Sequence, residues 1–295
     1  MRRRAFRFGV KVRSAAGAGA WRAQARAMED LGYDTLVMPD HPDDQWAPLV
    51  ALAAAAAATT TIRLGTMVLA NDFRHPAVLA KELATLDVLS EGRLEVGMGA
   101  GWQPGDYETL GLAFDPPAAR VARLEAAVPL LKARWADGLP PPAQRPHPPV
   151  LVAGGGRRVL ALAAREADIV GFNTTLAAGA WGPEAARAAL AGPFRERVEW
   201  VREQAGERFG ALELHCNTAV CMVGADPRAM AEAMAPGLDI TPEEALDVPM
   251  ALVGSVDQLC ETLERRRELF GFSYWCVPAA SAEAFAPVIA RLAGR

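Results

Sequence analysis

The stretch Ile62–Trp102, which reads IRLGTMVLANDFRHPAVLAKELATLDVLSEGRLEVGMGAGW, decides the fold. It begins with an apolar strand-like run, continues through a helix that opens with proline at Pro76–Leu89, and returns to a second strand that ends in alternating glycines. Strand, helix and strand in this order are typical of a parallel α/β architecture. Because barrel enzymes work at the carboxyl ends of their strands, we expect the functional residues there.

Outward from this unit, strand-like and helical stretches alternate along the whole chain. We predict eight strands, at Phe6–Val12, Thr35–Met38, Ile62–Ala70, Leu94–Met98, Val150–Ala153, Ile169–Phe172, Leu212–Met222 and Tyr274–Val277. Helices are predicted at Trp21–Leu31, Pro48–Thr59, Pro76–Leu89, Ala118–Ala136, Arg157–Glu166, Pro183–Ala205, Val256–Phe270 and Ala282–Leu292, with an irregular stretch at Asp226–Leu246. Residues 1–295 are therefore expected to form a single α/β domain, a (β/α)8 TIM barrel.

The composition sets limits on what the chain does. Of its 295 residues, 51% are hydrophobic and 22% charged, and the net charge is -4. This is typical of a compact folded protein and argues against a nucleic-acid partner, which requires a basic face. The longest uncharged apolar run, Leu49–Ala58, is too short to span a bilayer, so we expect no membrane partner and a cytoplasmic location. The cysteines at 216, 221, 260 and 276 lack C-x-x-C spacing, so we expect neither a disulfide nor a structural metal.

Asp40 and His41 directly follow the second strand, in YDTLVMPDH, so their side chains are expected at the C-terminal rim of the barrel. An imidazole beside a carboxylate can move a proton near neutral pH, which makes the two residues candidate catalytic groups. The alternative is a structural loop or helix cap. Trp46 follows closely and is predicted either to wall a substrate pocket or to pack in the core.

Glycines mark the ends of the third and fourth strands. Gly65 interrupts an apolar strand, which indicates either a bulge or a tightly packed barrel strand. The run Gly97–Trp102, GMGAGW, lets the backbone lie flat against a planar ring or a sugar chain, unless it is a plain turn. We therefore take Gly99, Ala100 and Gly101 as candidate ligand-binding residues and Trp102 as a candidate for the substrate pocket.

The strand Val150–Ala153 runs into Gly154, Gly155 and Gly156 and then into a helix that begins with Arg157 and Arg158. Free N–H groups and the positive end of the helix dipole, together with the arginines, predict an anion site that suits a phosphate. The alternative is a bare turn with solvated arginines. The spacing of a Rossmann G-x-G-x-x-G motif is absent, and so is that of a P-loop.

With these motifs placed, the chain resembles the luciferase-like monooxygenase superfamily of (β/α)8 barrels, and within it the branch that uses the 5-deazaflavin coenzyme F420. The most specific pieces are PDHPDDQWAPL, the opening stretch, PPAARVARLEAAV and PHPPVLVAGGGRRVLALAAREADIVGFN, which together span nearly the whole chain. The resemblance implies a bacterial-luciferase-like barrel that binds a tricyclic ring at its C-terminal end, against a bulge in the third strand.

The resemblance also implies roles for individual residues. The bulge carries a non-prolyl cis peptide in such enzymes, and the matching bond here is Met67–Val68. The acid–histidine position beside the ring matches Asp40 and His41. The remaining cofactor contacts match Ala100 and Gly101 at the ring or ribityl chain, Gly155 and Gly156 at the phosphate, and Asn173 near the phosphate.

Two departures from the family pattern limit the expected substrate. The segment between the fourth helix and the fifth strand is shortened after Trp135 to the proline-rich link 140–149, PPPAQRPHPP, so we expect an open substrate side. The spacing from His41 to Trp46 differs from that of the sugar-phosphate dehydrogenases, and no matching set of lysines is present. Oxidation of glucose 6-phosphate is therefore not expected.

The resemblance predicts an F420-dependent oxidoreductase that passes a hydride between C5 of the deazaflavin and a small organic substrate, for instance with an activated C=C or C=N bond, while Asp40 and His41 handle the proton. Two alternatives stay open: an FMN-dependent luciferase-like monooxygenase and a barrel subunit without catalytic activity. A homodimer is expected, because the thin alanine helix at 51–58 suits a subunit contact, although burial within the barrel's outer ring explains it equally well.

Overall fold

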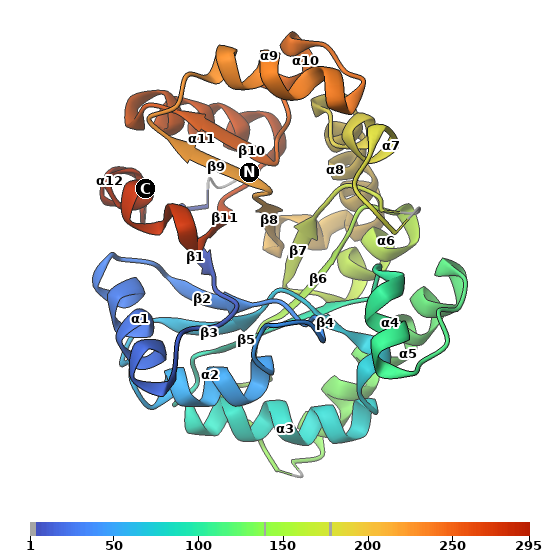
Figure 1. Cartoon of the computed structure of the whole chain (residues 1–295). Coiled ribbons are helices and arrows are strands. Elements are labelled where there is room, and N and C mark those ends of the chain that lie inside the picture. Colours follow the sequence, from blue (N-terminus) through green and yellow to red (C-terminus); the bar gives the residue numbers. More distant parts are fainter. Residues whose placement is uncertain (1–3, 139, 177–178) are drawn as a thin grey trace.

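The computed structural model describes residues 4–138, 140–176 and 179–295, and in this part of the chain eight parallel strands close into a barrel ringed by helices (Figure 1). The barrel strands are β1 (Arg7–Lys11), β2 (Thr35–Met38), β3 (Arg63–Thr66), β5 (Leu94–Gly99), β6 (Val150–Gly154), β7 (Ile169–Phe172), β8 (Glu213–Asn217) and β11 (Tyr274–Pro278). The ring closes because β3 pairs with both β2 and β5. The predicted TIM-barrel fold is confirmed.

Helices cover the outside of the barrel, and their ends follow the sequence signals. They are α1 (Ala18–Asp30), α2 (Pro48–Ala56), α3 (Pro76–Leu89), α4 (Pro104–Leu110), α5 (Pro117–Ala136), α6 (Arg157–Glu166), α7 (Pro183–Ala188), α8 (Ala191–Ala205), α9 (Pro227–Leu238), α10 (Pro242–Leu246), α11 (Val256–Phe270) and α12 (Ala282–Leu292). Several begin with proline, whose missing N–H is not needed at a first helical position. Helix α11 has a capping box between Ser255 and Gln258 and ends at Gly271 in the left-handed conformation.

The structure differs from the prediction after the seventh barrel strand. The run Leu212–Met222, predicted as one strand, divides into β8 and β9 (Val220–Val223). Strand β9 leaves the barrel and pairs with β10 (Ala251–Gly254), which was not predicted, in a separate two-stranded parallel sheet. The apolar pattern continues through the break, so it indicated burial but not a change of sheet. The irregular stretch predicted at Asp226–Leu246 contains α9 and α10, which lie over this sheet (Figure 1).

An ion-pair layer fills the N-terminal end of the barrel interior. A carboxylate oxygen of Glu95 lies 2.7 Å from both Arg7 Nη1 and Arg63 Nε, and Arg7 also pairs with Glu213 at 2.7 Å. Burial alone raises the pKa of Glu95, but the two guanidinium groups outweigh burial and hold that pKa below its ordinary range. Gln144, in the proline-rich link, accepts a hydrogen bond from Arg63 at 3.0 Å. The shortened link therefore lies at this end of the barrel.

Replacing Glu95 with glutamine is expected to lower the free energy of unfolding by about 3 kcal/mol, because Arg7 and Arg63 lose a buried charged partner. A carboxylate with a lowered folded pKa stabilises the fold above its unfolded pKa and loses this effect as the pH falls through the folded pKa. Between neutral pH and about pH 4 and below, the free energy of unfolding measured by urea titration should therefore fall less steeply in the variant than in the unmodified protein. Glu199→Gln, which breaks an exposed pair with Arg202, is the control and should cost less than about 0.5 kcal/mol. Equal effects of the two substitutions would contradict the prediction.

Candidate functional site

A cavity of about 540 Å³ opens at the C-terminal end of the barrel, opposite the ion-pair layer. It brings together most of the residues that the sequence singled out. The predicted residues that line it are Asp40, His41, Met67, Val68, Gly99, Ala100, Gly101, Trp102, Gly154, Gly155, Gly156 and Asn173. The mouth of the barrel is thus hollow and is walled by the strand ends at which function was expected.

A bulge in the third strand forms one wall of the cavity. The strand is interrupted after β3, and β4 (Leu69–Ala70) resumes it two residues later. The peptide bond between these two residues, Met67–Val68, is cis, as the resemblance implied. A Cβ at position 97 would lie 2.0 Å from the carbonyl oxygen of Thr66, and one at position 99 would lie 2.5 Å from Val68 Cγ2. The alternating glycines of β5 are therefore required because the bulge lies directly on this strand.

His41 forms a hydrogen bond across the cavity wall with a residue that sequence reasoning missed. Its Nδ1 lies 2.7 Å from Oδ2 of Asp106, which is buried near the start of α4. A carboxylate only accepts hydrogen bonds, so Nδ1 donates to Asp106, and Nε2 is the ring nitrogen left for another partner. Trp102 meets the imidazole edge-on, with ring centroids 6.0 Å apart. The arrangement fixes the ring's orientation and supplies a group able to take up or release a proton.

Asp40 has a different environment from the one predicted. Its two carboxylate oxygens accept hydrogen bonds from Arg74 at 2.6 and 3.0 Å, and Oδ2 also accepts one from the backbone N–H of Ala70 at 3.1 Å. Both partners lie just beyond the bulge in the chain. Asp40 therefore holds the bulge segment in place, and the carboxylate that contacts His41 is that of Asp106.

The glycine loop after β6 has the geometry of an anion site. A Cβ on Gly155 would lie 2.5 Å from the backbone of Thr174, so this residue packs where no side chain fits. Gly156 is the N-cap of α6, has no capping side chain, and has no other atom within 4 Å of an added Cβ. Arg197 supports the loop from behind by donating to the Gly155 carbonyl at 2.9 Å, and burial lowers the pKa of Arg197 to about 10. The uncapped start of α6 therefore borders the cavity through Gly156, where its first N–H groups lack a side-chain acceptor.

Two predicted residues lie away from the cavity lining. The guanidinium of Arg157 sits over the ring of Trp200 at 5.5 Å, and the neighbouring Arg158 pairs with Glu125 at 2.5 Å. Trp46 packs on Trp21, with ring centroids 5.5 Å apart. The structure thus gives these side chains protein partners outside the cavity, so the uncapped start of α6 is what the loop offers to an anion.

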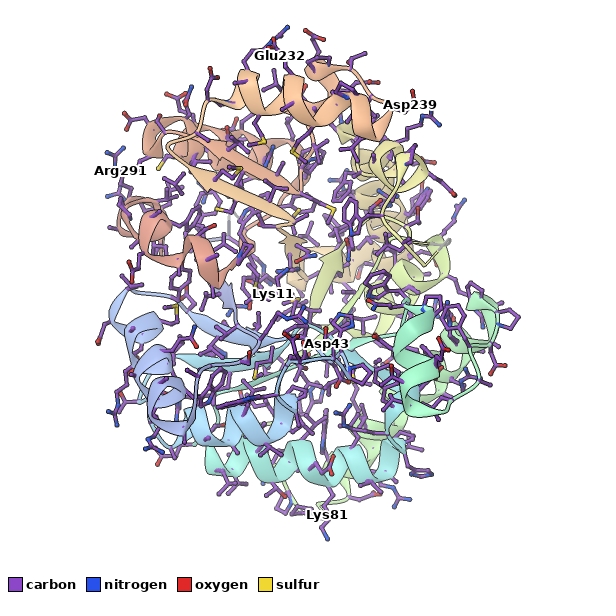
Figure 2. All side chains as sticks on the ribbon, viewed as in Figure 1. Lys11, Asp43, Lys81, Glu232, Asp239 and Arg291 are labelled. Carbon is purple, nitrogen blue, oxygen red and sulfur yellow. The ribbon has the colours of Figure 1, made fainter. Side chains whose placement is uncertain are left out.

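Two cations in the cavity wall were not predicted. Arg120, on α5, is 5% exposed, and its Nε and Nη1 have no hydrogen-bond partner among the described residues. Lys11, at the end of β1, donates to Asn217 Oδ1 at 2.9 Å, and burial lowers the pKa of Lys11. Figure 2 shows Lys11 near the centre of the molecule, whereas Lys81 extends from the outer surface. A buried guanidinium with free donors at a cavity wall favours an anionic ligand.

The described residues contain no cluster of three or more His, Cys, Asp and Glu side chains suited to a metal ion. In the same part of the chain, no helix combines the length and apolar character needed to cross a bilayer.

Comparison with known proteins shows what the whole chain is similar to. An F420-dependent glucose-6-phosphate dehydrogenase of Beutenbergia cavernae is 36% identical over 174 residues, which cover 51% of this chain and 51% of that protein. The chain spans about half to two thirds of the length of the curated relatives first found.

Solved structures resemble the whole chain. The coenzyme F420 dependent tetrahydromethanopterin reductase from Methanopyrus kandleri superposes with a TM-score of 0.74 at 18% identity, over 98% of each chain. The oxygenating constituent of 3,6-diketocamphane monooxygenase from Pseudomonas putida, solved in complex with FMN, has a TM-score of 0.69 at 17% identity, again over 98% of each chain. At these identities the likeness shows the fold. The family model described as luciferase-like monooxygenase matches residues 5–250, and the chain therefore belongs to this family.

Proposed function

We propose that the protein is an F420-dependent oxidoreductase that transfers a hydride between C5 of the deazaflavin and a small organic substrate. The observation that carries the proposal is the single cavity that joins the His41–Asp106 pair, the bulge at Met67–Val68 and the open N-terminus of α6. A proton-handling group, a flat backbone surface and an anion site are the three features that a ring with a ribityl phosphate requires. The names of F420-dependent relatives support the choice of cofactor.

The residues present fit such a cofactor. Gly156 leaves the helix end uncovered, and Arg120 is a buried cation with free donors on the same cavity wall. Both features are unfavourable in an empty site and become favourable when a phosphate accepts their hydrogen bonds. The residues expected to hold the phosphoryl group are therefore the Gly155–Gly156 turn, the first N–H groups of α6 and Arg120.

In the proposed mechanism the protein binds and orients the cofactor and exchanges a proton with the substrate. The bulge and Ala100–Gly101 would hold the ring with backbone groups, which would keep its position fixed. Asp106 holds the imidazole of His41 through Nδ1, which leaves Nε2 to take up or release the proton that accompanies reduction or oxidation of the substrate. The bound deazaflavin supplies the hydride chemistry itself. Substrates with activated C=C or C=N bonds suit this division of roles.

An FMN-dependent monooxygenase is the second candidate. The residues proposed to hold the ring, the ribityl chain and the phosphate would serve FMN as well as F420, because both cofactors contain these groups. A monooxygenase solved in complex with FMN is also among the structural neighbours. Glucose 6-phosphate is a poorer candidate substrate, because Lys11 is the lysine that lines the cavity while Lys81 and Lys132 lie on the outer helices α3 and α5. The third alternative, a subunit without catalytic activity, leaves the His41–Asp106 pair unexplained.

A titration with each cofactor tests the proposal. Tryptophan fluorescence of the purified chain should be quenched by F420 with micromolar or tighter affinity, and reduced F420 should be oxidised when an enone or imine substrate is added. Binding of FMN alone would select the monooxygenase, and binding of neither cofactor would favour the non-catalytic subunit.

We also infer a homodimer that acts in the cytoplasm. Support for the dimer comes from α2 and α3, which expose Val50, Val78 and Leu89 with 73%, 54% and 61% of their surface accessible. Apolar side chains exposed on neighbouring helices favour a subunit contact. Light scattering coupled to gel filtration measures the mass directly, and a monomer mass would contradict the dimer.

A further inference from the structure

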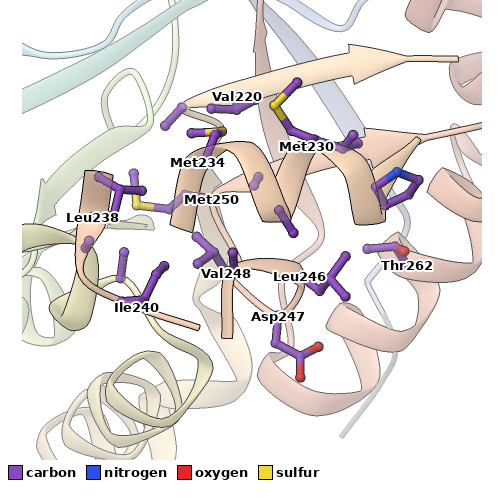
Figure 3. Close-up of a pocket in the computed structure, with 18 of the residues that line it drawn as sticks. Val220, Met230, Met234, Leu238, Ile240, Leu246, Asp247, Val248, Met250 and Thr262 are labelled. Carbon is purple, nitrogen blue, oxygen red and sulfur yellow. The ribbon is translucent and has the colours of Figure 1, made fainter. Parts of the chain in front are cut away.

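A second cavity, of about 760 Å³, lies outside the barrel between the β9–β10 sheet and helices α7, α9, α10 and α11. Figure 3 shows Met234, Met250, Val248 and Leu238 directed into the same space. We call this cavity the methionine chamber. Its volume falls in the range of small-molecule sites, roughly 300 to 1,000 Å³.

Helix α9 forms the roof of the methionine chamber with an apolar stripe. Met230, Met234 and Leu238 recur every four residues and so lie on one face of the helix, and all three line the cavity. The helix buries only Ala231 and Ala235. Long apolar side chains on one face normally pack into a core, but here they border open volume. Methionine adapts its shape to a bound apolar group, which makes this stripe suited to a ligand.

The charges around the methionine chamber exclude a charged occupant. Arg266 is buried, but its guanidinium donates three hydrogen bonds to backbone carbonyls between Val248 and Ala251, at 2.7 to 3.0 Å. Glu243 is exposed and pairs with Arg228 at 2.8 Å. The other charged lining side chains, Asp247, Glu261 and Arg265, are exposed at the edge. An occupant therefore meets an apolar interior without a free charge.

The methionine chamber adjoins the cavity at the barrel mouth. Trp181 lines both cavities. Thr174, in the wall of the mouth, donates a hydrogen bond to the carbonyl of Ala185 at 2.6 Å and so ties the mouth to α7. Ala186 and Ala189 of this helix line the chamber. The two cavities are therefore neighbours that share Trp181 as a wall residue.

We propose that the methionine chamber binds the uncharged apolar chain of an elongated substrate whose reacting end lies in the barrel mouth. The substrate class is then a linear alkyl or acyl compound with a polar, reducible or oxidisable end. This inference rests on the proposed function for the reacting end, whereas binding of the chain depends on the chamber alone.

Calorimetry with hexanol, octanol and decanol on the cofactor-free protein tests the chamber directly. Affinity should rise roughly fourfold for each added methylene until the chamber is filled, because each buried methylene contributes a constant free energy. An affinity that does not depend on chain length would overturn the proposal.

Met234→Asp places a charge in the roof and should weaken decanol binding at least tenfold and flatten the chain-length dependence. Met222→Asp is the matched control, because Met222 is 40% exposed and Met234 37%, and Met222 lies on β9 outside the lining. Leu238→Gln is the second variant and should act like Met234→Asp if the latter folds poorly. Equal binding in Met234→Asp and Met222→Asp, with both folded, would contradict the assignment.

The link between the two cavities is tested by turnover. With F420-loaded enzyme and linear 2-enals of increasing length, KM should fall with chain length while kcat stays constant, and Met234→Asp should remove the trend. Chain-dependent alkanol binding without any trend in KM would overturn the placement of the substrate chain. Failure to bind F420 with alkanol binding retained would refute the proposed function and leave the apolar-chain site standing.

Discussion

His41→Ala is expected to slow hydride transfer by roughly 10²- to 10⁴-fold, the range in which a positioned acid or base contributes. The affinity for F420 should change by less than about threefold, because in the proposed complex backbone groups and Arg120, not His41, hold the phosphate and the ring. Stopped-flow absorbance of the deazaflavin measures the rate, and a fluorescence titration measures the affinity. Added imidazole should restore part of the rate if the lost group moved a proton.

Substitutions at the neighbouring residues distinguish a chemical role of His41 from a structural one. Asp106→Asn keeps the shape but removes the charge that orients the imidazole, so we expect a smaller loss, roughly 10- to 100-fold, in kcat. Asp40→Asn should lower stability instead, because it breaks the paired contact with Arg74. His75→Ala, at an exposed histidine outside the barrel mouth, is the control and should leave the rate unchanged. Full activity of His41→Ala would remove this residue from the mechanism.

The barrel could be predicted from the sequence because its signal is local. Each strand and helix carries its own apolar period and its own punctuation, as in Pro76–Leu89, and eight such units in order leave few other folds. The cis peptide at Met67–Val68 followed from the family resemblance, and the structure explains the accompanying glycines by the contact between the bulge and β5.

The partners of the site residues could not be predicted because they are distant in sequence. Asp106 lies 65 residues after His41, and Arg74 lies 34 residues after Asp40. Adjacency in the chain suggested that Asp40 and His41 act together, but neighbouring residues after a strand point in different directions. Arg120 gave the weakest signal, because a single arginine in an amphipathic helix resembles any solvated cation until its burial is known.

The methionine chamber was missed for a related reason. Periodicity indicates which face of a helix is apolar, but it does not indicate whether another element fills the space opposite that face. The stretch Asp226–Leu246, predicted as irregular, contains the 12-residue α9, which has Pro236 near its end, and the five-residue α10, and the two are separated by Asp239 in a left-handed conformation. The division of Leu212–Met222 between two sheets created the floor of the chamber, and the sequence pattern did not mark that division.

Gly156→Asp is expected to weaken F420 binding by roughly 100-fold while leaving the fold as stable as before or more stable. The position has room, since no atom lies within 4 Å of an added Cβ, and it is the N-cap of α6. Aspartate is a favoured N-cap and, compared with the glycine it replaces, should add a few tenths of a kcal/mol of stability. The same carboxylate occupies the N–H groups that a phosphate needs and repels its charge by about 3 kcal/mol at an intermediate dielectric constant.

Gly192→Asp is the control, because Gly192 is the second residue of α8 and likewise has no atom within 4 Å of an added Cβ, but it does not line the mouth of the barrel. Thermal unfolding and fluorescence titrations on both variants give two independent readouts. Stability kept in both variants, with affinity lost only in Gly156→Asp, places the phosphate at the start of α6. Unchanged affinity in a folded Gly156→Asp protein would show that the anionic group binds elsewhere in the cavity, which leaves Arg120 as the remaining site for it.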